Sequence, residues 1–125
     1  MIALALSLAV ATPAPRLTVN FVAPAEIHFN RRGDSTLTVT VGKTSRTVTL
    51  DGLPDPADPK NVYLSLHPST LAFARPFKGP VRLRAYLYLC DAKNGVCTVQ
   101  ELEKTVQLGE GRDFRLDWKV DGASR

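Results

Sequence analysis

Cys90 and Cys97 are the only two cysteines of this 125-residue chain, and they are its strongest candidates for chemistry. Asn94-Gly95 lies between them, and both residues tolerate the positive φ of the tight turns that join antiparallel strands. If the flanking segments pair about this turn, the two cysteines face each other within reach of a disulfide. Such a bridge can either brace the hairpin or exchange with the thiols of another protein.

The segment before the turn, Val81 to Cys90, predicts which side chains accompany the first cysteine. Apolar and polar residues alternate along it, as they do in a strand with one buried face. Cys90 falls on the polar face, which also carries Arg82, Arg84, Tyr86 and Tyr88. Because positive charge favours a thiolate, Arg84 is expected to promote exchange, whereas Asp91 is expected to oppose it. Arg84, Tyr86, Tyr88 and Asp91 are therefore candidate modulators of the pair.

Other chemistries have little support in the sequence. A zinc site built from both cysteines, His28 and His67 is disfavoured because the histidines lack metal-ligand spacing, and no metal or small-molecule cofactor is expected. The net charge of +4 is scattered, with no basic run longer than Arg31-Arg32, which argues against nucleic acid as a partner. Arg32-Gly33-Asp34 matches an adhesion tripeptide, but Gly-Asp is ordinary turn chemistry.

The N-terminal segment has the pattern of an export signal. An apolar run over residues 2–11 ends in Ala9-Val10-Ala11, which predicts a signal peptide over 1–11, cleaved before Thr12. The alternative is a buried N-terminal strand or helix; the run is too short to span a bilayer. A proline-rich leader over 12–16 would follow. Export to the periplasm or outside the cell would expose the cysteines to oxidising conditions, which favour a disulfide.

Short alternating segments with turn residues between them recur along the remaining chain. They predict an all-β, immunoglobulin-like antiparallel β-sandwich of about seven to nine strands, forming one domain over 17–120 with a polar tail over 121–125. Residues 51–59 contain three prolines and a glycine and are expected to form an irregular loop, which either covers the cysteine hairpin or simply joins two sheets. After Thr98 the pattern is ambiguous, because Val99, Leu102 and Val106 have helical spacing whereas residues 105–108 alternate as a strand. A short turn over Glu101 to Glu103 and then a strand are expected. The expected strands lie at 17–21, 27–29, 37–41, 47–50, 62–66, 81–90, 97–99, 105–108 and 114–120, with a shorter apolar piece at 71–73.

The second half of the chain, LYLCDAKNGVCTVQELEKTVQL, resembles the N-terminal domain of DsbD, the membrane thiol:disulfide interchange reductase, and related exported modules. In that family an immunoglobulin-like sandwich carries a cysteine pair on a hairpin, with an acidic residue and a glycine between the cysteines. The matching positions here are Cys90, Asp91, Gly95, Cys97 and the strand over 105–108. The resemblance spans about Leu71 to Leu108.

The resemblance implies an exported electron-transfer domain in which Cys90 and Cys97 are the exchanging pair. Its partners would be thioredoxin-like proteins or a membrane thiol reductase on a separate chain. The alternative, from a different class, is a non-catalytic structural or protein-interaction module whose disulfide only stabilises the hairpin. A partly exposed sulfur favours exchange, and a bridge buried under packed side chains favours the second function.

Overall fold

The computed structural model describes residues 15–73, 78–109 and 113–120. The predicted signal peptide, the tail over 121–125 and most of the proline-rich leader lie outside these residues. Pro15 is buried, and Arg16 begins the first strand. Within the described residues, no helix is long and apolar enough to cross a membrane.

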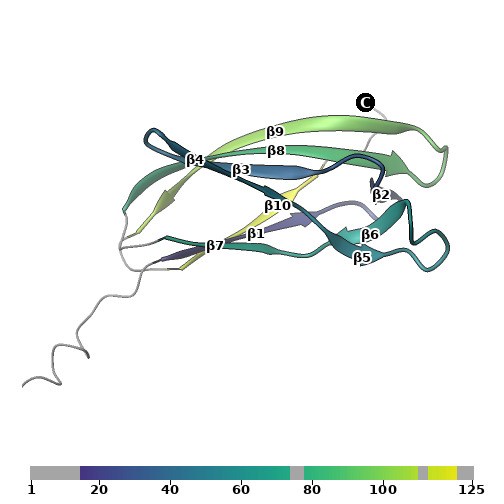
Figure 1. Ribbon diagram of the computed structural model, residues 1–125, viewed down its shortest axis with the longest axis horizontal. Coiled ribbons are helices and arrows are strands. Elements are labelled where there is room, and N and C mark those ends of the chain that lie inside the picture. The colour runs from purple at the N-terminus through teal and green to yellow at the C-terminus, as the bar shows by residue number, and fades with distance from the viewer. Residues whose placement is uncertain (1–14, 74–77, 110–112, 121–125) are drawn as a thin grey trace, which may run out of the picture.

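The described chain forms ten strands in two sheets, so the prediction of an all-β sandwich is confirmed, with slightly more strands than expected (Figure 1). The strands are β1 (Arg16–Val22), β2 (Ile27–Asn30), β3 (Thr36–Val41), β4 (Thr44–Thr49), β5 (Gly52–Pro54), β6 (Val62–Leu66), β7 (Ser69–Ala72), β8 (Gly79–Asp91), β9 (Cys97–Leu108) and β10 (Phe114–Lys119).

The larger, seven-stranded sheet is organised around β8. β9 pairs with one edge of β8 along its whole length, from Gly79–Leu108 to Cys90–Cys97. β3 and β2 share the other edge, with β3 next to Arg82 to Tyr86 and β2 next to Leu89 to Asp91. β4 pairs with β3, and β6 pairs with β2 and β5. The outward face of this sheet therefore brings side chains from distant parts of the sequence next to β8.

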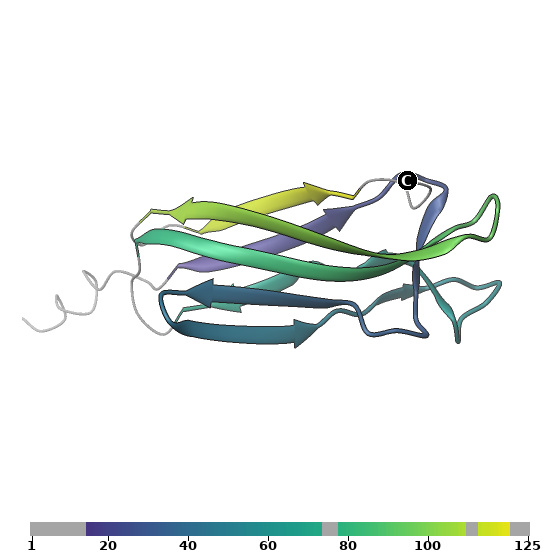
Figure 2. The ribbon, with the colours of Figure 1, turned by 90° about the horizontal axis from the view of Figure 1, so that it is seen from above.

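The smaller sheet has the order β10-β1-β7 and lies beneath β3, β8 and β9 of the larger one (Figures 1 and 2). β1 and β10 run parallel, with Leu17 opposite Phe114 and Val22 opposite Lys119. The chain passes from the larger to the smaller sheet between β6 and β7, at the His67-Pro68 corner.

The hydrophobic core lies between the two sheets and explains the alternation seen in the sequence. Leu83, Leu87 and Leu89 of β8 are almost fully buried, and Leu17 and Val19 of β1 face them from the other sheet. Phe21 and Trp118 stack with ring centroids 5.5 Å apart. Each fully buried aliphatic side chain contributes about 1.5–3 kcal/mol by leaving water, so this face determines the register of β8.

Two sequence expectations are wrong. The predicted turn over Glu101 to Glu103 is part of β9, which is continuous because Leu102 and Glu103 pair with Ala85 and Arg84 of β8. The loop over 51–59 is not entirely irregular, because Gly52–Pro54 forms β5 and pairs with β6. Pro54 lies beyond a register shift in this strand, where a missing N–H is tolerated.

Candidate functional site

The two cysteines form a disulfide at the end of the β8–β9 hairpin. The sulfurs are 2.04 Å apart and the Cα atoms 4.0 Å apart. Cys90 is directly opposite Cys97, as the turn signal predicted. The Asp91 N–H donates to the Val96 carbonyl at 2.8 Å, and Gly95 takes a φ of 75° in the turn. The neighbouring cysteine pair is therefore of the closely spaced, non-hydrogen-bonded type, which brings the two sulfurs within bonding distance.

The disulfide lies on the outward face of the sheet and not in the core. Cys97 is exposed and Cys90 is half-buried. Both line a surface hollow of about 200 Å³. The other residues that line it come from β2, β6 and the segments next to them: Asn30, Arg32, Asp58, Asn61 and Val62. A reactant can therefore reach the disulfide from solvent on the side of the hollow.

His28 and Arg32 lie near the disulfide, which the sequence analysis did not anticipate. His28 is the register partner of Cys90 on β2, so its side chain emerges on the same face as the disulfide. Arg32 lines the hollow from the turn after β2. Both approach Cys90 only through the pairing of β2 with β8, and the sequence around them carries no signal of this pairing.

The end of the loop over 51–59, which was expected either to cover the hairpin or to join two sheets, borders the disulfide together with the residues that follow it. Asp58 and Asn61 line the hollow beside the cysteines. Arg31 holds this segment in place, because its backbone N–H donates to the Asn61 carbonyl at 2.7 Å and its guanidinium donates to the Pro59 carbonyl. The same guanidinium lies 4.5 Å from the centroid of the Tyr63 ring. The segment thus forms one wall of the hollow.

Arg84 and Tyr86 share the face of Cys90 but do not lie beside it. Arg84 is six residues from Cys90 along an extended strand, or roughly 20 Å. Its guanidinium forms ion pairs with Glu103 at 3.0 Å and Glu101 at 3.3 Å. The negative charge and hydrogen bond of Glu103 raise the pKa of Arg84 above its ordinary value. Arg84 does not line the hollow beside the disulfide, and Arg32 is the cation that does.

Tyr88 and Asp91 are close to Cys90 in different ways. Tyr88 is two residues away on the same face and packs flat against Gly33, where a Cβ atom would collide with the ring. Asp91 falls on the opposite, buried face and is only 7% exposed. One of its carboxylate oxygens accepts a hydrogen bond from the Lys93 N–H at 2.8 Å. The Asp91 carboxylate thus orders the turn and is directed away from the disulfide.

Of the two histidines considered as zinc ligands, His28 lies beside the cysteines and His67 does not. His67 lies at the corner between β6 and β7, where its backbone N–H donates to the Asp51 backbone carbonyl at 2.9 Å. No cluster of three or more potential metal ligands occurs in the part of the chain that the structure describes.

Comparison with known proteins does not assign the chain to a family. No protein-family model matches it, and no curated protein matches it with significant similarity. The geometry therefore carries the functional argument: this is a β-sandwich domain with a disulfide on its outward face.

Proposed function

We propose that this chain is an exported thiol–disulfide exchange domain, similar to the N-terminal domain of DsbD, in which Cys90 and Cys97 are the redox pair. The observation that carries the proposal is the accessible disulfide: Cys97 is exposed, and both cysteines line a hollow open to solvent. A disulfide that served only to brace the fold would function equally well under packed side chains. Exchange, in contrast, requires in-line approach of a thiolate to one sulfur.

The proposed reaction transfers two electrons from a partner's dithiol. A partner thiolate attacks Sγ of Cys97, the more exposed cysteine, forming a mixed disulfide and releasing Cys90 as a thiolate. The partner's second thiolate then attacks its own sulfur in the mixed disulfide and releases Cys97. The partner becomes a disulfide, and Cys90 and Cys97 take up two protons as thiols. The Arg32 guanidinium, which lines the same hollow, would stabilise the Cys90 thiolate in this sequence.

The reduction potential of the pair tests the proposal directly. The protein is equilibrated in a series of glutathione and dithiothreitol redox buffers, and its free thiols are trapped and counted. A potential within the roughly −120 to −270 mV range of exchange proteins supports the proposal. A potential below about −300 mV, the range of structural disulfides, contradicts it.

A charge variant tests whether the surroundings of the disulfide participate. Arg32→Gln is expected to slow reduction by a small dithiol roughly threefold, because a nearby cation stabilises the leaving thiolate. Arg46→Gln is the matched control: Arg46 of β4 is also exposed, but it is opposite Val39 of β3 and so emerges on the other face of the sheet. Equal rates for wild-type protein and both variants would remove Arg32 from the mechanism.

The second candidate is a non-catalytic structural or interaction module with a stabilising disulfide. It is favoured by the position of the disulfide, which closes the turn at the far end of the longest hairpin. Two results would together establish this function. The variant with both cysteines replaced by alanine keeps its fold, and the reduction potential of the disulfide lies below about −300 mV.

A further inference from the structure

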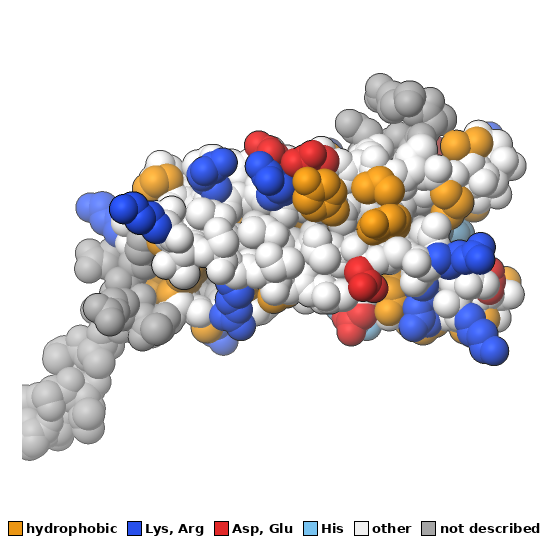
Figure 3. All heavy atoms as spheres, turned by 45° about the horizontal axis from the view of Figure 1, so that its top comes forward, with side chains coloured by type: hydrophobic (Ala, Val, Ile, Leu, Met, Phe, Trp, Pro, Cys, Tyr) orange, Lys and Arg blue, Asp and Glu red, His pale blue; other side chains and the backbone are white. Residues whose placement is uncertain are grey.

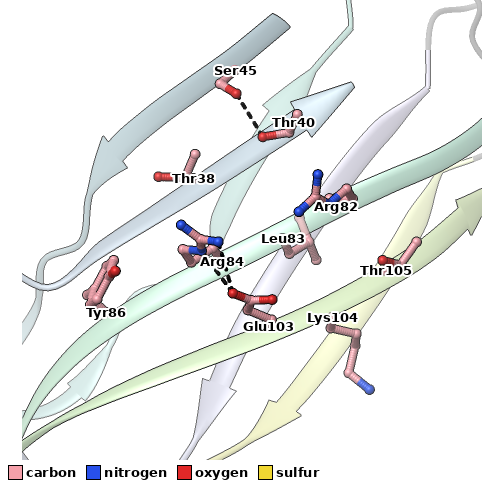
Figure 4. A pocket seen from close by; sticks show the side chains of 10 residues that line it. All are labelled: Thr38, Thr40, Ser45, Arg82, Leu83, Arg84, Tyr86, Glu103, Lys104 and Thr105. Atoms are coloured by element: carbon pink, nitrogen blue, oxygen red, sulfur yellow. Dashed lines mark hydrogen bonds and ion pairs between the residues drawn. The ribbon is translucent and has the colours of Figure 1, made fainter. Parts of the chain in front are cut away.

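A second hollow, of about 370 Å³, lies on the same outward face and is lined from β3, β4, β8 and β9. It includes Arg82, which is eight residues from Cys90 and so roughly 26 Å from the disulfide along β8. Most of the side chains that line it carry a polar or charged group (Figure 4). The residues are Thr38, Thr40, Ser45, Arg82, Leu83, Arg84, Tyr86, Glu103, Lys104 and Thr105.

The two arginines of this hollow differ in their partners. Arg84 is held by Glu101 and Glu103. Arg82 is exposed, and its side chain makes no ion pair or hydrogen bond within the described residues. Figure 4 shows its guanidinium at the surface, with Thr40 on one side and Thr105 on the other. Both threonines are its register partners on the neighbouring strands. An unpaired guanidinium between hydroxyl donors matches the geometry of an oxyanion, above all a carboxylate.

Paired hydroxyl groups continue the polar surface across β3 and β4. Thr40 and Ser45 are hydrogen-bonded through their hydroxyls at 2.8 Å, as are Thr38 and Thr47. Each such pair keeps one free O–H and free lone pairs after its own bond is made, so it can both donate and accept. Glu103 adds an acceptor beside them. Donors and acceptors repeated at the spacing of neighbouring strands suit a ligand that itself carries many hydroxyls.

The distribution of charge limits the ligand further. Basic and acidic side chains lie side by side on this face (Figure 3), so it has no continuous basic stripe. Glu101 and Glu103 would repel a densely charged polyanion such as nucleic acid. A chain with one carboxylate per sugar unit can instead place one carboxylate on Arg82 and only hydroxyls beside the glutamates.

We propose that this hollow binds an acidic oligosaccharide of the uronate class. A carboxylate of the ligand pairs with the Arg82 guanidinium and accepts hydrogen bonds from the Thr40 and Thr105 hydroxyls. Ser45 then donates its O–H to Thr40, and the ring hydroxyls of adjacent sugars donate to Glu103 and to the Ser45 oxygen. The size of the hollow is at the lower end of the range of small-molecule sites. This site is separate from the disulfide and does not depend on its redox chemistry.

Titration calorimetry of the full chain with tetragalacturonate at low ionic strength tests the proposal. Arg82→Gln is expected to weaken binding by at least about tenfold, as expected for a lost charge-assisted pair. Thr105→Val preserves shape and strand preference and should weaken binding roughly fivefold through one lost hydrogen bond. Arg46→Gln removes the same charge from the other face of the sheet and should leave the affinity within about twofold.

Four outcomes would overturn the proposal. Tetragalacturonate does not bind, or neutral cellotetraose binds as tightly, in which case no carboxylate is recognised. Sodium acetate alone matches the tetrasaccharide, so the ring hydroxyls contribute nothing. Finally, Arg46→Gln weakens binding as much as Arg82→Gln, so the attraction is only to net positive charge. Thermal melting of each variant verifies that the fold is retained. Thr105→Val tests the affinity for tetragalacturonate independently, because it changes no charge.

Discussion

Reduction of the Cys90–Cys97 disulfide should destabilise the domain by a predictable amount. The disulfide closes a loop of eight residues, with a sequence separation of 7. In the chain-entropy model, closing a loop of this length in the unfolded state is worth about 2.5 kcal/mol. The rest of the hairpin remains paired from Gly79–Leu108 to Leu89–Thr98, and the buried face of β8 still specifies its register. We therefore expect the reduced domain to stay folded and to lose only the loop-closure contribution.

The same number can be measured in two independent ways. Urea unfolding of the oxidised and reduced protein gives the difference in the free energy of unfolding directly. Thermodynamic linkage requires the reduction potential of the folded pair to lie below that of the unfolded pair by the same energy, or about 50 mV for 2.5 kcal/mol. Thiol trapping in redox buffers, with and without denaturing urea, measures this second quantity. Agreement between the two measurements also verifies that unfolding is two-state.

The difference in the free energy of unfolding shows whether the disulfide only closes the loop or also affects other contacts of the folded state. A loss above about 4 kcal/mol would refute the loop-closure argument, because the disulfide would then hold tertiary contacts as well. A difference near zero, or a more stable reduced form, would mean that the folded state favours the dithiol. The double variant Cys90→Ala/Cys97→Ala is the control for effects of the free thiols and should match the reduced protein within about 1 kcal/mol.

Three further predictions concern the surroundings of the sheet. Gly52→Ala should cost about 3 kcal/mol or more in urea unfolding, because the added Cβ would meet the Ser65 backbone carbonyl; a loss below about 1 kcal/mol would show that β5 can move freely. Gly33→Ala should cost about 1–2 kcal/mol and displace the Tyr88 ring, since that side chain can move where backbone cannot; an unchanged near-ultraviolet spectrum of the tyrosines would contradict this. Leu87→Ala, at a fully buried position, should cost about 3–5 kcal/mol, and a cost near 1 kcal/mol would argue against the proposed packing between the sheets.

The elements that sequence reasoning identified are those with strong local patterns. The alternation along β8 is nearly uninterrupted because one face is buried in the core, and Asn94-Gly95 places the turn from local conformational preference alone. β9 was broken in the prediction because Val99, Leu102 and Val106 also fit helical spacing. Only its pairing with β8 resolves the ambiguity, and this pairing is a tertiary contact.

The candidate site divides in the same way. The cysteine pair was predictable because both partners belong to one hairpin, whose register follows from its turn. His28 and Arg32 were not, since they reach the disulfide through a strand that is about 60 residues away in sequence. Arg84 was predicted on the correct face, but it lies too far along β8 to act on Cys90 and pairs with Glu103 instead. Alternation specifies a face of the strand and not a distance along it.

The parallel pairing of β1 with β10 has a consequence for how the domain is made. Leu17 is opposite Phe114, so the middle strand of the smaller sheet lacks one neighbour until nearly the whole domain has been synthesised. A chain emerging from a ribosome or through a narrow pore can form the β8–β9 hairpin as soon as Leu108 has emerged, because its contacts are local. Until Phe114 to Lys119 follow, however, the apolar face of β1 and the rings of Phe21 and Trp118 cannot be enclosed together. Protection from proteases and from edge-to-edge aggregation should therefore be acquired late and in one step.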